Sequence, residues 1–197
     1  RSNLKLPGLQ QQLISEIKKT GTPIVLVLMN GRPLNLSYEN ETVDAIVEAW
    51  FPGTSGGHAI TDVLYGSYNP SGKLTVTFPR NVGQIPIHYN MKNTGRPKDI
   101  VGAHTRYVSK YIDVENSPLF PFGYGLSYTS FKYEQPTLSS NSLSRKRTLT
   151  VKTVVTNTGS KDGEEVVQLY IKDRFGSITR PVKELKGFEK IKLNKGE

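Results

Sequence analysis

Residues 49–64, AWFPGTSGGHAITDVL, decide how the first part of this chain folds. An apolar run precedes the glycines and a helical pattern follows them, which predicts a strand, a tight turn and a helix. Gly53, Gly56 and Gly57 are expected where a side chain would clash. Gly53, Ser55 and Gly57 also have the G-x-S-x-G spacing of a serine nucleophile at such a turn. Ser55 is therefore either a nucleophile or a turn residue available to cap the helix.

The segments around this turn alternate between helical and extended patterns up to about residue 80. The run IVLVLM at 24–29 predicts a strand covered on both faces, and AIVEAWF at 45–51 predicts a second one. KLTVTF at 73–78 predicts a further strand with one polar face. Two helical stripes flank these runs, which predicts βαβ layers. The stripes consist of Leu9, Leu13, Ile14 and Ile17, and of Ala59, Ile60, Val63 and Leu64.

The rest of the chain follows two other patterns. Residues 81–131 are rich in Gly, Pro, Asn and Tyr without periodicity, which predicts an irregular connector that packs against other parts. From about residue 132, short alternating runs such as EEVVQLYIKD at 164–173 predict an immunoglobulin-like β-sandwich. Such a sandwich usually has about 100 residues. We therefore expect residues 132–197 to be an incomplete one.

Composition limits the chemistry that this chain can perform. The sequence has no cysteine, which excludes disulfides, thiolate catalysis and zinc–sulfur sites. No apolar run reaches the about 18 residues of a membrane span. Residues 132–197 carry 14 Lys and Arg against 8 Asp and Glu, within a net charge of +9. They are either a basic binding module or a solvated β surface with protected strand edges. We expect the latter, with neither nucleic acid nor a membrane as partner.

The sequence offers few candidates for nucleophilic catalysis. A serine triad needs an acid and then a histidine after Ser55. Asp62 followed by His88 or His104 has that order, but the chain has no HGGG-like segment for an oxyanion hole. A serine esterase that uses Ser55 is therefore the alternative from a different class of enzyme.

Other site types have equally little support. The glycines lack both the lysine of a phosphate-binding loop and the G-x-G-x-x-G spacing, and the histidines lack metal-ligand spacing. Asp44 and Glu48 stand four residues apart, and glycosidases need two carboxylates about 5–9.5 Å apart. Asn35 and Asn40 begin N-x-S/T sequons. We expect no metal and no cofactor.

Long collinear blocks resemble a known family. The blocks GTPIVLVLMNGRPL (21–34), AWFPGTSGGHAITDVLYGSYNPSGKLTVTFPR (49–80) and PLFPFGYGLSYTSF (118–131) resemble the C-terminal half of glycoside hydrolase family 3, the β-glucosidase family. Its bacterial periplasmic members are the most similar. VTNTGSKDGEEVVQLYIKD (155–173) and RPVKELKGFEKI (180–191) resemble the fibronectin type III-like domain that follows in those enzymes.

The resemblance implies a fold and a division of the chain. The fold class is α/β plus all-β, a partial α/β sandwich followed by an incomplete immunoglobulin or fibronectin III-like β-sandwich. Residues 1–90 would be the C-terminal part of the family 3 α/β-sandwich domain. Residues 91–131 would be an aromatic-rich connector, and residues 132–197 the fibronectin type III-like domain. Ser55 would be a turn residue.

The resemblance also implies a function. The chain would be a fragment of a periplasmic or secreted β-glucosidase that hydrolyses terminal β-D-glucosyl residues with retention, through one nucleophilic and one proton-transferring carboxylate. The nucleophile would lie on an N-terminal (β/α)8 barrel, and the acid/base glutamate just before the segment that matches RSNLKLPG. No carboxylate of this chain matches either position. The chain would support the active site of an enzyme whose substrate is a β-glucoside or an oligosaccharide.

The candidate substrate-binding residues come from the position of the strands. In α/β sheets, ligands gather beyond the carboxyl ends of the strands. Asn30 and Arg32 follow the first predicted strand, and Phe51 follows the second. These three residues are the candidates, and turn or sheet-cap roles are the alternative for each.

Overall fold

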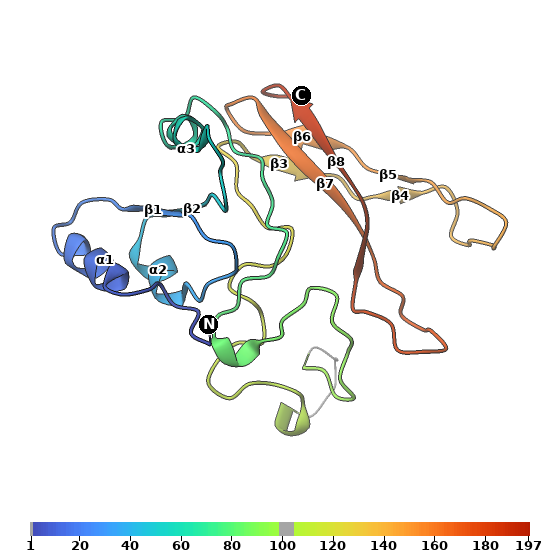
Figure 1. Ribbon diagram of the computed structural model, residues 1–197. Helices are drawn as coiled ribbons and strands as arrows, with labels where there is room; N and C mark the ends of the chain where they lie inside the picture. The colour runs from blue at the N-terminus through green and yellow to red at the C-terminus, as the bar shows by residue number, and fades with distance from the viewer. Residues whose placement is uncertain (1, 99–104) are drawn as a thin grey trace.

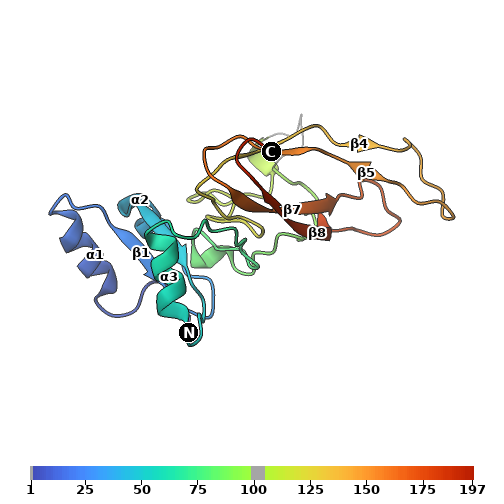
Figure 2. The same cartoon turned by 90° about the horizontal axis from the view of Figure 1, so that it is seen from above.

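The computed structural model describes residues 2–98 and 105–197 (Figure 1). Its first part contains, in chain order, α1 (Gln10–Lys18), β1 (Val25–Leu28), α2 (Ser37–Thr42), β2 (Ala45–Glu48) and α3 (Gly56–Leu64). Figures 1 and 2 show α3 on one side of the two strands, and α1 and α2 on the other. The first part is therefore layered as α/β, as predicted.

Strands β1 and β2 are parallel neighbours, with Val25 opposite Ala45 and Leu28 opposite Glu48. Parallel strands need a crossover connection, and here it runs through α2. Both strands lie within the apolar runs at 24–29 and 45–51, so these two predictions are confirmed. The pair is the only sheet in the first part among the residues that the structure describes.

The turn between β2 and α3 requires two of its glycines. Gly53 has a φ of +73°, in the left-handed region that side chains with a Cβ rarely adopt. A Cβ on Gly56 would lie 2.7 Å from the side chain of Pro52. A Cβ on Gly53 or on Gly57 would meet nothing within 4 Å, so the expected clash is found at Gly56 alone and is wrong at the other two glycines.

Two alanine substitutions at this turn are expected to have opposite effects. Gly56→Ala should lower the free energy of unfolding by about 1–3 kcal/mol, because Pro52 or the first turn of α3 must move. Gly57→Ala should raise it by up to about 1 kcal/mol, because alanine favours the helix and its methyl group has space. Urea denaturation measures both, and equal effects would contradict the geometry.

The core of the first part is small and lies beside the strands. It consists of Leu28, Leu34, Leu36 and Phe78, against which Trp50 and Phe120 pack. The Phe78 ring centroid is 5.9 Å from that of Trp50 and 6.2 Å from that of Phe120. This aromatic contact joins the segment after β2 to the connector, which contributes Phe120.

The strand predicted at residues 73–78 is absent. Phe78 forms an isolated antiparallel bridge with Phe120. The Leu74 N–H donates to the Tyr124 carbonyl at 2.8 Å, and the Phe78 N–H to the Phe120 carbonyl at 2.9 Å. Separate bonds to the irregular connector replace a continuous ladder, so the side chains need not alternate. Thr77 is accordingly buried while Val76 is exposed.

The predicted helical stripe on α1 forms, but most of it is uncovered. Ile14 is buried, whereas Leu9 is 76% exposed and Leu13 60% exposed. Amphipathic periodicity predicts which face is apolar but does not tell what covers that face. No helix in the described part of the chain is long and apolar enough to cross a membrane.

The connector is ordered by side chains rather than by long elements. It includes two short 3-10 helices, η1 (Val82–Gln84) and η2 (Thr105–Tyr107). Asn81 caps η1, and the Gln84 amide donates to the Glu115 carbonyl at 2.7 Å. The rings of Tyr89 and Phe122 stack with centroids 4.2 Å apart. The connector therefore packs, as its aromatic content predicts.

The second part consists of antiparallel strand pairs. Figure 1 shows β4 and β5 projecting away from the other strands. The exposed run Arg145–Arg147 lies between these two strands, in a loop. The pairs are β3 (Phe131–Tyr133) with β6 (Val155–Asn157), β4 (Thr137–Leu138) with β5 (Val151–Lys152), and β7 (Gly163–Ile171) with β8 (Glu184–Leu193).

Residues 68–73 attach the first part to β7 and the turn before it. The Tyr68 hydroxyl donates to Glu164 Oε2 at 3.1 Å, and the Asn69 amide donates to the Asp162 carbonyl at 2.9 Å. Lys73 Nζ lies 3.0 Å from Glu165 Oε2, and both side chains of this ion pair are largely buried. The two parts are thus joined by directional side-chain bonds in addition to the chain itself.

Candidate functional site

The candidate site lies at the carboxyl edge of β1 and β2. Because the strands are parallel, the residues that follow each of them meet at one edge. Asn30–Arg32, the edge loop, follows β1, and Phe51 follows β2. The Phe51 ring lies against Gly31, where a Cβ would be 2.6 Å from a ring atom. The structure therefore brings the predicted residues together, with Phe51 83% exposed beside the loop.

Asn30 and Arg32 also shape the edge loop. Asn30 Nδ2 donates to the Arg32 carbonyl at 2.6 Å, which closes the loop on itself. Arg32 Nη2 donates to the Asn3 carbonyl at 3.3 Å and so holds the segment before α1. Both side chains thus have structural partners, as the turn-residue interpretation expects.

Glu48 and Trp50 belong to this edge as well, although the sequence analysis did not propose them as binding residues. Glu48 Oε1 accepts a hydrogen bond from the Trp50 N–H at 3.0 Å. Trp50 has a φ of +49°, a left-handed conformation that is strained for a bulky residue. Burial raises the pKa of the Glu48 carboxyl, while the Trp50 N–H and the Asn30 amide act in the opposite direction. No sequence pattern signals a left-handed tryptophan.

Two buried oxygen atoms at this edge have unused hydrogen-bonding capacity. No residue in the described ranges donates to Asn30 Oδ1 or to Glu48 Oε2. A buried acceptor without a donor is costly, by about 1–3 kcal/mol. Solvent does not reach either oxygen, so a donor from a ligand or another segment could pair with them only if the edge loop or Trp50 moved. Their unused capacity is therefore an energetic cost at this edge and does not by itself define a binding site.

The raised pKa of Glu48 predicts a pH dependence of stability. The folded state binds the Glu48 proton more tightly than the unfolded state does. The stabilisation that protonated Glu48 adds to the free energy of unfolding is therefore fully present below the ordinary pKa of 4.5. It is lost as the pH rises through the higher pKa of the folded state. Glutamine at this position does not titrate. The melting temperature of Glu48→Gln should therefore rise relative to that of the wild type as the pH increases from 4 to 7. Melting curves across that range measure the difference, with the exposed Glu41→Gln as the control.

Among the residues that the structure describes, the other chemical candidates form no site, and no cluster of acidic and histidine side chains could hold a metal. Asp44 precedes β2 and Glu48 ends it, so the two residues lie at opposite ends of the strand. The Asp44 carboxylate accepts from the Ile24 N–H, whereas Glu48 accepts from the Trp50 N–H. Each carboxylate is thus bonded locally, and the two do not form a pair. Ser55 stands at the N-cap of α3 but makes no capping side-chain bond, so the expected cap is wrong. His104, one possible triad member, lies outside the described residues.

Comparison with known proteins identifies the family. Residues 1–128 match the glycosyl hydrolase family 3 C-terminal domain, and residues 165–197 match the fibronectin type III-like domain. The chain therefore belongs to glycosyl hydrolase family 3, and the expected fold class is confirmed. The boundaries at residues 90 and 131 stay a prediction.

Individual relatives agree with this assignment. The periplasmic β-glucosidase of Salmonella typhimurium is 54% identical over all of this chain, which covers 26% of that protein. A β-xylosidase of Formosa agariphila is 46% identical, again over the whole chain and 26% of the relative. The structure of a Listeria innocua β-glucosidase with isofagomine superposes with a TM-score of 0.93 at 45% identity, over 98% of this chain and 27% of that one. The chain thus spans about a quarter of the proteins that it matches.

Proposed function

We propose that this chain is part of a periplasmic retaining β-glucosidase, in which it supports the active site without contributing either catalytic carboxylate. The observation that carries the proposal is the 54% identity to the Salmonella typhimurium periplasmic β-glucosidase over the full chain. The separate local hydrogen bonds of Asp44 and Glu48 agree with it, because the nucleophile and the acid/base would come from the other three quarters of such an enzyme. A β-xylosidase is the second candidate, because relatives with that name also match the whole chain.

The uncovered surface beside β1 supports a larger assembly. The edge of β1 away from β2 has no strand partner among the described residues. A groove of about 640 Å³ runs along it, between β1 and residues 5–10. Leu9, Leu13 and Met29 are exposed nearby. An unpaired strand edge next to apolar side chains is suited to a further strand and helix of the same enzyme.

Turnover assays test the proposed function. The full-length protein should hydrolyse an aryl β-glucoside faster than the matching aryl β-xyloside, whereas this chain alone should give no turnover above a heat-inactivated control. A preference for the xyloside would favour the second candidate. Turnover by this chain alone would contradict the assignment of both catalytic carboxylates to the rest of the enzyme.

We propose that Phe51 and the edge loop contact the aglycone, the leaving group of the substrate. Phe51→Ala in the full-length enzyme should raise KM about three- to tenfold, because an exposed aromatic ring offers an apolar surface to the ligand. Phe175→Ala is the matched control, since Phe175 is 95% exposed in the loop between β7 and β8. Initial-rate kinetics on an aryl β-glucoside compare the two variants, and equal KM values would exclude Phe51 from substrate binding.

A further inference from the structure

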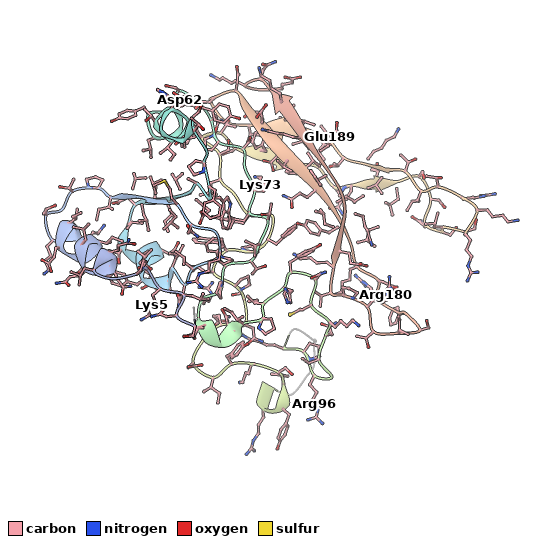
Figure 3. The ribbon with its side chains drawn as sticks, in the orientation of Figure 1. Lys5, Asp62, Lys73, Arg96, Arg180 and Glu189 are labelled. Atoms are coloured by element: carbon pink, nitrogen blue, oxygen red, sulfur yellow. The ribbon has the colours of Figure 1, made fainter. Side chains whose placement is uncertain are left out.

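A second cavity lies at the junction of the two parts, away from the carboxyl edge of β1 and β2. Its volume is about 350 Å³, within the range of small-molecule sites. Its walls come from the connector, from β3 and β7, and from the segment before β8. In Figure 3, the labelled Lys73 side chain lies between the first part and β7. The lining residues are Lys73, Pro121–Tyr124, Tyr133, Glu165, Val166, Gln168, Tyr170 and Lys183.

Aromatic rings form much of the cavity wall, and other rings hold them in place. Phe122 stacks on Tyr89 at 4.2 Å, and Tyr124 stacks on Phe120 at 5.5 Å between centroids. Each stacked partner covers one face of the lining ring and fixes its orientation. The wall therefore offers rigid apolar surface before any ligand binds.

The polar groups of the cavity are held by one another. Lys73 Nζ lies 3.0 Å from Glu165 Oε2 and donates to the Gly125 carbonyl at 2.9 Å. The Tyr133 hydroxyl donates to Glu165 Oε1 at 2.9 Å. These bonds fix the side chains in one arrangement, so little conformational entropy would be lost when a ligand binds.

Two further side chains of β7 in the cavity wall, Gln168 and Tyr170, are held in the same way. The Tyr170 hydroxyl donates to Gln168 Oε1 at 2.6 Å, and Gln168 Nε2 donates to the Gly123 carbonyl at 3.1 Å. Lys183 Nζ lies 5.1 Å from the centre of the Tyr170 ring. An ammonium has three donors and a phenol oxygen also accepts, so both lysines and both tyrosines keep capacity for further bonds.

We propose that this junction cavity binds a neutral saccharide. A sugar hydroxyl both donates and accepts, which matches a wall that offers lysine donors and tyrosine oxygen acceptors together. The apolar face of a sugar ring matches the fixed aromatic wall. Lys73 and Glu165 neutralise each other, so the ammonium of Lys183 is the only unbalanced charge among the lining residues, and it can donate to a sugar oxygen. The proposal does not depend on the catalytic activity of the enzyme.

Hydrogen–deuterium exchange of the full-length protein with D-glucose tests the proposal, because it reports where the ligand binds. Glucose should slow exchange in peptides that contain residues 121–124 and 165–170. Lys183→Ala and Tyr170→Phe should each raise the glucose concentration for half-maximal protection about tenfold, as for the loss of one hydrogen bond. Lys186→Ala, the matched control on β8, should leave it unchanged.

Three results would overturn the proposal. The first is glucose protection confined to other segments, which would place all saccharide binding elsewhere. The second is protection of the junction by inorganic sulfate and not by glucose, which would make it an anion site. The third is unchanged protection in both cavity variants, which would exclude these side chains from binding.

Discussion

Replacing Phe78 with alanine is expected to lower the free energy of unfolding by about 3–5 kcal/mol. Phe78 is 1% exposed and contacts Trp50 on one side and Phe120 on the other. The core beside β1 is small, so its neighbours have few ways to collapse into the space that the ring leaves. The substitution also removes the ring contact between the first part and the connector, while the backbone hydrogen bonds between Phe78 and Phe120 remain.

Urea denaturation followed through Trp50 fluorescence measures this loss, since Trp50 is the only tryptophan of the chain and lies next to the substituted ring. Phe188→Ala is the matched control, because Phe188 lies on β8 and is 72% exposed. It should change the free energy of unfolding by about 0.5 kcal/mol or less. Comparable losses in the two variants would show that the core does not centre on Phe78.

Lys73→Met is expected to lower the free energy of unfolding by about 3 kcal/mol or more. The Lys73 and Glu165 side chains are only 15% and 12% exposed, so removing the ammonium leaves a poorly solvated carboxylate. Tyr133 still donates to that carboxylate but supplies no positive charge. Breaking one half of a buried pair therefore costs more than the pair itself contributes.

The double variant Lys73→Met with Glu165→Leu separates these two effects. It should recover much of the lost stability, because neither buried charge remains. Lys186→Met is the control for an exposed pair, since Lys186 Nζ lies 3.3 Å from Glu184 Oε1 at the surface. Its cost should be about 1 kcal/mol or less. Urea denaturation of all the variants tests the scheme, and a double variant no more stable than Lys73→Met would contradict it.

The parts of the fold that the sequence predicted well are those where periodicity and burial agree. The apolar runs at 24–29 and 45–51, of which the second is interrupted only by Glu48, contain β1 and β2. Apolar and polar residues alternate clearly at 73–78, yet no strand pairs with this segment in the described part of the chain. Alternation alone therefore did not produce a strand. The stripe on α1 formed with Leu13 exposed, because a helical pattern defines a face and not its neighbour.

The candidate site was predicted for a topological reason. Asn30, Arg32 and Phe51 meet because parallel strands end at the same edge, and this follows from strand order without any side-chain detail. Glu48 and Trp50 were missed because their role depends on a left-handed backbone and on one specific hydrogen bond. The absent Ser55 cap has the same origin, since a cap depends on backbone angles that composition does not determine.

The side-chain bonds between residues 68–73 and β7 have an evolutionary consequence. Fibronectin-like modules joined only by a flexible linker can be exchanged between proteins with little penalty. Here a foreign module would need an acidic residue where Glu165 stands, or Lys73 would be buried without its counter-charge, and it would need an acceptor for Tyr68 where Glu164 stands. This module is therefore constrained to diverge together with the domain before it, and recombination at the junction is expected to be disfavoured.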